Sequence, residues 1–257
     1  MKETGERGEA GWCTYPDGLE DNPEIEVFCG AENERTPAGA ACWRQGHLLH
    51  FAFEQSPAQM NEAGQRLLLN SIAYISRFTE DRPIAVTPSV FGGPTACPRV
   101  YLDRSLGERG DLARVAHLLS PKTAAELQRM GAAAVRLWHA QNRPYLHPSA
   151  EQKLEMDVEA RALGVPFDRL EWFDKMIGEL RGGGQAAQVA ARLLARYAPI
   201  GACSDNSVTT WEQWFKENRA YLFFSEQGDY RWYVDPLAKK RGVPSKQLRG
   251  PARASRP

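Results

Sequence analysis

The chain has 257 residues, 42% hydrophobic and 25% charged, a composition that excludes a collagen, a disulfide miniprotein and a disordered tail. Its 32 basic and 32 acidic residues cancel, so the overall charge gives no reason to expect binding to nucleic acid. No apolar run reaches the ~18 residues of a membrane span, and the mixed charges of the first seven residues do not form a secretory signal. We expect a soluble protein without a membrane span; its location is unknown, and cytoplasmic only by default.

Residues 24–30 and 46–54 are expected to form two strands, the second containing β-favouring aromatic residues. Pro37, Ala38 and Gly39 are assigned to the connection between them. A helix is expected to begin at Ser56 and Pro57, because serine caps helix N-termini and proline suits the first turn. Its broad apolar face, which we expect to pack on the sheet, contains Leu67, Leu68, Ser71, Ile72 and Ile75.

Residues 82–98 contain four prolines and two glycines in 17 positions, so neither helix nor sheet should continue through them. We place an interdomain linker there, after a first unit at 1–81. The basic, apolar-poor residues 245–257 are expected to form a flexible tail.

The cysteines do not form a C-x-x-C pair, which argues against a zinc knuckle or a thioredoxin-type site. Neither a metal nor a cofactor is expected. A disulfide of Cys13 with Cys29 or Cys42 would require an exported protein. The full set is Cys13, Cys29, Cys42, Cys97 and Cys203.

Beyond the linker the spacing of apolar residues favours helices at 112–119, 124–141, 170–180 and 186–197, with three consecutive glycines at 182–184 separating the last two. The second part of the chain is therefore expected to be mainly helical.

A duplication is present in this second part. Residues 138–146 match 214–222 at an offset of 76, and residues 157–166 match 235–244 at an offset of 78. The two-residue difference falls where a hairpin turn can absorb it. The pattern predicts a helix, a hairpin and a short helix, once within 99–169 and again within 170–244.

The matching residues offer two polar sites, Asn142, Arg143 and Asp157 in the first copy and Asn218, Arg219 and Asp235 in the second. The structural alternative is that the Asn ends a helix, the Arg pairs with a neighbour and the Asp caps the next helix.

The second copy is dense in aromatic residues. By the period-2 rule Trp232 and Tyr233 face opposite ways, so either the cluster is core or one ring is exposed for carbohydrate or peptide recognition.

Residues 48–75 resemble the last strand and helix of class I glutamine amidotransferase-like domains, including the trehalose-utilisation type. In that family the strand ends in a Phe-His-Pro-Glu motif, followed by Ser/Thr-Pro, a Gly and a Leu-Leu-x-Asn helix. Here residues 51–54 stand at the motif, followed by Ser56 and Pro57, Gly64 and residues 68–70. The resemblance covers about residues 24–79 and implies a unit derived from a larger α/β fold.

The resemblance also implies what is missing. In active members the His takes a proton from a cysteine and the Glu orients that His, but Ala52 occupies the His position and cannot accept a proton. No nucleophile elbow surrounds Cys29. The residual site would consist of Glu54, His50 and Cys29. The early strands of the family's sheet are absent, so an exposed sheet edge favours association, including homo-oligomers.

These observations predict an α/β remnant, strands plus a packing helix, followed by a mainly helical α+β region with a duplicated helix-hairpin-helix unit. We expect a binding or scaffolding protein without catalytic activity, with a protein or small-molecule ligand. Two alternatives stay open: a hydrolase whose site lies in the helical half or at the domain seam, using His117, His139 or His147, and recognition by exposed aromatic residues.

Overall fold

The computed structural model describes residues 13, 22–33, 36–84, 99–203, 205 and 207–245. The chain divides into two compact units, Met1–Ile84 (unit 1) and Ala85–Pro257 (unit 2). The fold is mixed α/β, with helices predominating over small antiparallel sheets. Most of the predicted linker (85–98) and nearly all of the predicted tail (246–257) fall outside the described residues.

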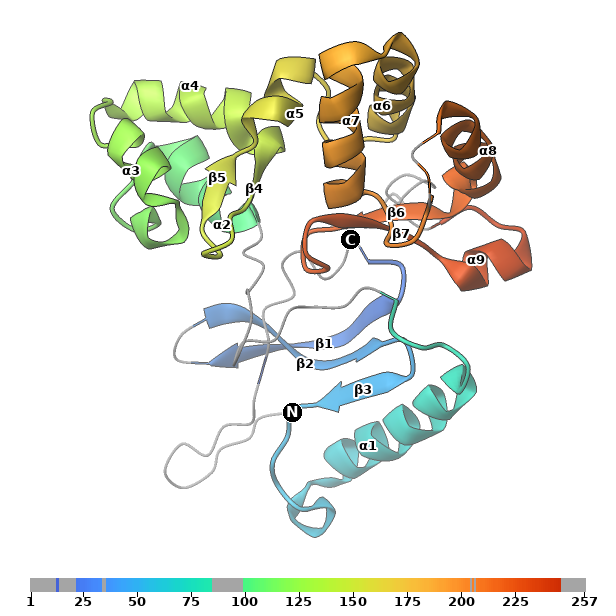
Figure 1. The fold of residues 1–257 in the computed structure, drawn as a ribbon. Coiled ribbons are helices and arrows are strands. Elements are labelled where there is room, and N and C mark those ends of the chain that lie inside the picture. The colour runs from blue at the N-terminus through green and yellow to red at the C-terminus, as the bar shows by residue number, and fades with distance from the viewer. Residues whose placement is uncertain are drawn as a thin grey trace. The chain divides into compact units, whose positions relative to one another are not determined.

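Unit 1 contains a three-stranded antiparallel sheet in the order β1 (Ile25–Asn33), β2 (Thr36–Gln45), β3 (Leu48–Phe51) (Figure 1). The assignment of residues 37–39 to a connection is wrong, because they belong to the central strand. Residues 36–42 are mostly small and carry little β-propensity of their own, but their pairing with β1 continues the strand whose later residues, 42–45, also pair with β3. Of the two predicted strands, the first extends to Asn33 instead of ending at residue 30, and the other is shorter than predicted at both ends.

Helix α1 (Glu62–Ile75) packs on this sheet. Its N-cap is Asn61, whose side chain accepts a hydrogen bond from the Gly64 N–H at 2.9 Å. The predicted start at Ser56 is therefore wrong for the α-helix, since Ser56 precedes only a 3₁₀ turn, Pro57–Gln59. The sequence pattern places Ile72 on the packing face, but its side chain is 54% exposed and does not belong to that face.

The first part of unit 2 is irregular. The predicted helix at 112–119 is wrong, because the only helical element within that segment is a 3₁₀ turn. The single helix predicted at 124–141 is two helices, separated near Gly131. The elements are α2 (Val100–Leu102), a π-helical segment (Asp103–Arg109), the 3₁₀ turn (Ala116–Leu118), α3 (Pro121–Leu127) and α4 (Ala132–Asn142).

The remainder of unit 2 consists of two antiparallel hairpins and five helices within its described residues (Figure 1). In chain order these are β4 (Leu146–Pro148), β5 (Leu154–Met156), α5 (Val158–Leu163), α6 (Glu171–Gly182), α7 (Gly184–Tyr197), α8 (Val208–Asn218), β6 (Leu222–Ser225), β7 (Arg231–Val234) and α9 (Pro236–Arg241). The predicted glycine break is confirmed, because Gly183 has φ +72° between α6 and α7.

One continuous hydrophobic core, rich in aromatic rings, fills unit 2. Phe167 stacks on Tyr197 with ring centroids 4.2 Å apart, and Phe173 stacks on Phe215 at 5.0 Å. Helix α6 contacts both α7 and α8, so it stands between them in this core. Within the described part of the chain, no helix is both long and apolar enough to cross a bilayer.

Candidate functional site

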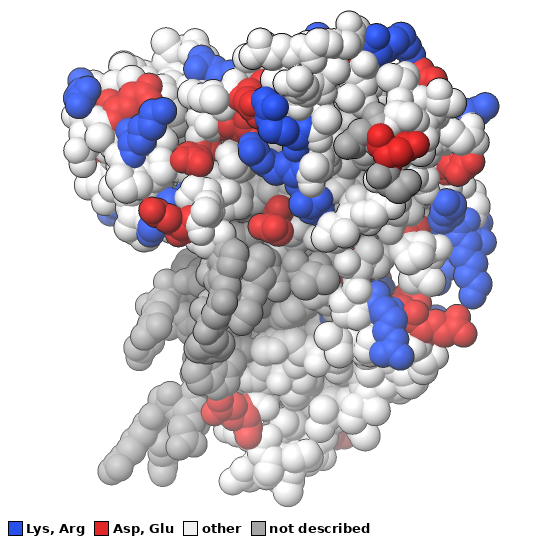
Figure 2. Space-filling view, viewed as in Figure 1, with Lys and Arg blue, Asp and Glu red and all other residues white. Residues whose placement is uncertain are grey.

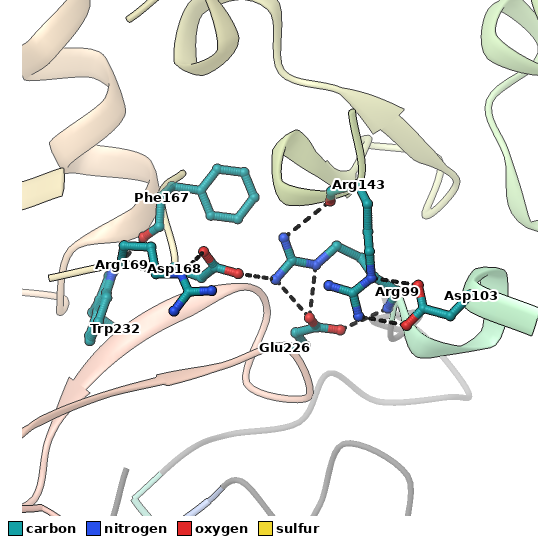
Figure 3. A network of polar contacts seen from close by, with 8 residues as sticks. All are labelled: Arg99, Asp103, Arg143, Phe167, Asp168, Arg169, Glu226 and Trp232. Carbon is teal, nitrogen blue, oxygen red and sulfur yellow. Dashed lines mark hydrogen bonds and ion pairs between the residues drawn. The ribbon is translucent and has the colours of Figure 1, made fainter. Parts of the chain in front are cut away.

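A buried network of charges in unit 2 surrounds Arg99 (Figure 3). The Glu226 carboxylate accepts hydrogen bonds from the Arg99 backbone N–H at 2.7 Å and from its Nε at 2.8 Å. On its other side the Arg99 guanidinium donates to Asp168 Oδ2 at 2.6 Å, and it also donates to the backbone carbonyl of Arg143 at 3.3 Å. Arg99 therefore joins the hairpin loop between β6 and β7 to the end of α4.

Arg143 extends the network to the π-helical segment. Its Nε and a terminal nitrogen donate to the two oxygens of Asp103 at 2.5 and 2.8 Å, a bidentate pair. The Nε2 atom of His139, a buried residue of α4, lies 3.3 Å from the same carboxylate. The predicted role of Arg143 as a pairing residue is confirmed.

The charges in the network are balanced, because three guanidinium groups face three carboxylates. Burial alone would lower the pKa of Arg99, but the charges of Glu226 and Asp168 outweigh it and raise that pKa. Burial would raise the pKa of Asp103, whereas contacts from His139 and Arg143 hold it below its usual range. Each charge lies within 4.0 Å of an opposite charge of the same network, which is the arrangement of a structural clamp. The set is Arg99, Arg143, Arg169, Asp103, Asp168 and Glu226.

Asn142 and Asn218 end helices α4 and α8 in the same way. The Asn142 side-chain amide donates to the Trp138 carbonyl at 2.8 Å, and that of Asn218 donates to the Trp214 carbonyl at 2.7 Å. These carbonyls belong to the last turns, where backbone acceptors lack helical partners. Both amides therefore serve local structure, as the structural alternative predicted.

Asp157 and Asp235 cap α5 and α9. The Oδ1 atom of Asp157 accepts from the Ala160 N–H at 2.9 Å, and that of Asp235 accepts from the Ala238 N–H at 2.9 Å. The predicted N-cap roles are confirmed.

Asp157 has a second set of contacts. The Tyr197 hydroxyl and Arg196 each donate to its Oδ2 atom at 2.6 Å. Burial would raise the pKa of Asp157, but these contacts and the capped N–H outweigh it and hold the pKa below its usual range. Both oxygens of this carboxylate therefore accept structural hydrogen bonds, Oδ1 from the helix N-terminus and Oδ2 from two side chains.

A groove of about 430 Å³ lies along α6 and α8 in unit 2. Arg219 lines it, with its guanidinium 3.8 Å from the Asp174 carboxylate and over the Phe215 ring, 5.3 Å from the ring centroid. The side chains of Ile177 and Phe215 add apolar surface. Three basic residues and two acidic residues line the groove, which leaves one positive charge in excess. The charged set is Arg181, Lys216, Arg219, Asp174 and Glu212.

On the face drawn in Figure 2, basic and acidic side chains are interspersed among the described residues. Basic side chains gather over α9, whose last turn contains Lys239, Lys240 and Arg241. One of these is engaged internally, because the Lys239 amine donates to the Asn218 side-chain oxygen at 2.8 Å.

The proposed remnant site in unit 1 is spread over the sheet. The register pairs Trp43 with His50 and Cys42 with Phe51, so His50 and Cys42 point to opposite faces. His50 packs against Trp43 with ring centroids 5.6 Å apart. Cys29 pairs with Cys42 across β1 and β2, and Glu54 is exposed beyond the end of β3. The sheet register does not bring His50 to the thiols.

Trp232 is a core residue, 2% exposed, and its indole N–H donates to the Phe167 carbonyl at 2.7 Å. Tyr233 is partly exposed and its hydroxyl donates to the Gly228 carbonyl at 2.7 Å. Trp232 is therefore not available in this structure as a stacking platform.

The alternative hydrolase would need a histidine beside a carboxylate in an accessible place. His147 is partly buried against Tyr197, and burial lowers its pKa, whereas the charge of Asp157 opposes that shift. His117 lies in the 3₁₀ turn before α3, where its backbone carbonyl accepts from Lys153. Among the described residues, no group of three or more His, Cys, Asp or Glu side chains could hold a metal ion.

No family model, curated protein or solved structure matches this chain.

The sequence pattern missed Arg99 and the α6 side of the groove. Arg99 follows the proline-rich segment, which offers no periodicity, and its partners are 69 and 127 positions away. Asp174 and Arg181 are ordinary charged residues of an amphipathic helix. Arg219 was the single groove residue that the sequence singled out, through its match with Arg143.

Proposed function

We propose that the chain is a non-catalytic binding protein. Its ligand site is the groove of α6 and α8, and its ligand is a small organic anion with an apolar body. Unit 2 contains two copies of a helix-hairpin-helix unit, and the copies have diverged so that the second one contributes to binding.

The duplication is supported by equivalent backbone hydrogen bonds at equivalent positions. The Asp157 N–H donates to the Tyr145 carbonyl at 2.8 Å, and the Asp235 N–H donates to the Tyr221 carbonyl at 2.9 Å. Each hairpin is followed by a short helix that begins at an Asp cap and ends at a glycine with positive φ. The two stretches therefore share local geometry as well as sequence.

The observation that carries the binding proposal is the different use of the two equivalent arginines. Arg143 is locked to Asp103 by two short hydrogen bonds. Arg219 has the same backbone setting at the end of its helix but is 53% exposed in the groove, 3.8 Å from Asp174. If the repeat required this arginine for its structure, both guanidinium groups would be held equally tightly. Arg219 is held less tightly than Arg143, so Arg219 is the candidate for ligand contact.

The groove suits a small molecule. Its volume of about 430 Å³ lies within the range of small-molecule sites, roughly 300–1,000 Å³. A guanidinium group can bind a carboxylate or phosphate through two parallel hydrogen bonds. The excess positive charge favours an anion, and Ile177 with Phe215 favours an apolar body next to it.

The proposed descent of unit 1 from an amidotransferase-like fold fits a non-catalytic role. Ala52 stands where the family has its base, and His50 faces away from Cys42. Cys29 and His50 therefore lack the nucleophile and base geometry that acyl transfer needs. Unit 1 would then serve as a scaffold.

The proposal is tested by titrating the full chain with benzoate and with benzylamine in a calorimeter. These probes share an aromatic body and differ in the sign of their charge. We expect heat of binding with benzoate and none with benzylamine. Equal binding of both, or binding of neither, would contradict an anion site. Turnover of benzoate esters or of glutamine that is lost on substitution of Arg219 would contradict the non-catalytic role.

A further inference from the structure

Two cysteines of unit 1 face each other across neighbouring strands. The register of the sheet pairs Cys29 of β1 with Cys42 of β2. Both are free thiols in this structure. The pair lies between two irregularities of the β1–β2 ladder, from Val27 to Cys29 and from Cys29 to Gly30.

This placement satisfies the distance requirement for a disulfide. Directly opposed residues of an antiparallel pair have Cα atoms about 4.5 or 5.5 Å apart, and disulfides span Cα separations of about 4.4–6.8 Å. Any directly opposed cysteine pair therefore lies within range. The ladder is irregular on both sides of this pair, where strands bend and twist more strongly than in a regular ladder.

The two thiols differ in access. Cys42 is fully buried and its sulfur lies 3.7 Å from the Ser71 hydroxyl of α1. Cys29 is partly exposed. An oxidant in solution can therefore reach Cys29 first, with Cys42 next to it as the resolving thiol.

We propose that Cys29 and Cys42 form a reversible cross-strand disulfide when the protein meets a small-molecule disulfide such as oxidised glutathione. The Cys29 thiolate attacks one glutathione sulfur, the glutathione S–S bond breaks, and one glutathione leaves as thiolate. The Cys42 thiolate then attacks the Cys29 sulfur of the mixed disulfide and releases the second glutathione. The two protons lost by the protein thiols end on the two glutathiones, which take up the two electrons.

Burial slows oxidation of the pair near neutral pH. Burial raises the pKa of both thiols. Hydrogen bonding to Cys42 partly opposes this rise for Cys29, and hydrogen bonding to Ser71 partly opposes it for Cys42. Only the thiolate attacks, so oxidation should accelerate as the pH rises above neutrality.

The test is peptide mapping of the full chain after incubation with oxidised glutathione and alkylation of the remaining thiols. We expect a peptide linked through Cys29 and Cys42, near-complete loss of alkylation at both, and full recovery after reduction with dithiothreitol. Cys203 is the one cysteine among the described residues of unit 2, so it should stay alkylatable.

Three variants complete the test. Cys29→Ser should abolish the linked peptide and leave Cys42 alkylatable, whereas Cys13→Ser and Cys203→Ser should leave the linked peptide unchanged. Mapping of the wild type needs no variant, so the proposal stays testable if Cys29→Ser does not fold. Full alkylation of Cys29 and Cys42 after oxidation, a stable glutathione adduct on Cys29, or a link from Cys29 to Cys13 would each overturn the proposal.

Discussion

Arg99 and Glu226 lie 127 positions apart in the sequence, and the Glu226 carboxylate accepts hydrogen bonds from both the backbone and the guanidinium of Arg99. The same guanidinium bridges to Asp168 and to the carbonyl of Arg143. A single side chain thus connects the start of the described part of unit 2 to both hairpin-bearing stretches.

Replacing Arg99 by Met should destabilise unit 2 severely. The change keeps a long side chain but leaves the two partly buried carboxylates of Asp168 and Glu226 without the buried cation, and breaking a buried ion pair costs about 3–5 kcal/mol. Chemical denaturation followed by circular dichroism measures it. A change in unfolding free energy below about 0.5 kcal/mol, the usual range for surface substitutions, would show that Arg99 is not a clamp.

Asp157→Ala should cost more stability than Asp235→Ala. Both variants lose an N-cap, about 1 kcal/mol, but only Asp157 also accepts hydrogen bonds from Tyr197 and Arg196. Such charged hydrogen bonds contribute about 1.5–3 kcal/mol each. The two variants are matched controls for each other in one denaturation series, and equal losses would contradict the assigned contacts.

The pH dependence of stability should carry a signature of Asp157. Its pKa is lower in the folded state than in the unfolded chain, so its contribution is complete above the unfolded value of about 3.9 and is lost as the pH falls below it. Unfolding free energy measured from pH 6 downward should therefore decline below about pH 4. Asp157→Asn should flatten that decline. If the unfolding free energies of the variant and the wild type fell in parallel with pH, the lowered pKa of Asp157 would be contradicted.

Trp232→Phe should affect stability and leave ligand binding intact. The substitution removes the buried hydrogen bond to the Phe167 carbonyl, which leaves that acceptor without its partner at a cost of about 1–3 kcal/mol. Thermal unfolding measures the loss. Weaker benzoate binding by a folded Trp232→Phe protein would show that Trp232 contributes to ligand recognition and would contradict this prediction.

Local signals in the sequence located the capping residues and the hairpins of unit 2 well. Asp157 and Asp235 precede short helices that stop at Gly164 and Gly242, and such signals act within a few residues. The break at Gly183 was predictable for the same reason.

Elements that depend on distant partners were not predictable. The small residues in the first part of strand β2 are held in the sheet by pairing with β1. The π-helical segment that presents Asp103 is fixed by packing on α4. The groove joins residues of α6 and α8, a juxtaposition that periodicity along one helix cannot reveal.

The central claim is that Arg219 is a ligand-binding residue. Arg192 is a matched control, because its side chain is equally exposed at 53% and also pairs with a carboxylate, Glu159, outside the groove. Calorimetric titration of benzoate into the wild type, Arg219→Gln and Arg192→Gln is the most direct measurement. We predict a Kd about tenfold or more higher for Arg219→Gln, as expected for loss of a charged hydrogen bond, and an unchanged Kd for Arg192→Gln. Equal Kd values for all three proteins would contradict the account.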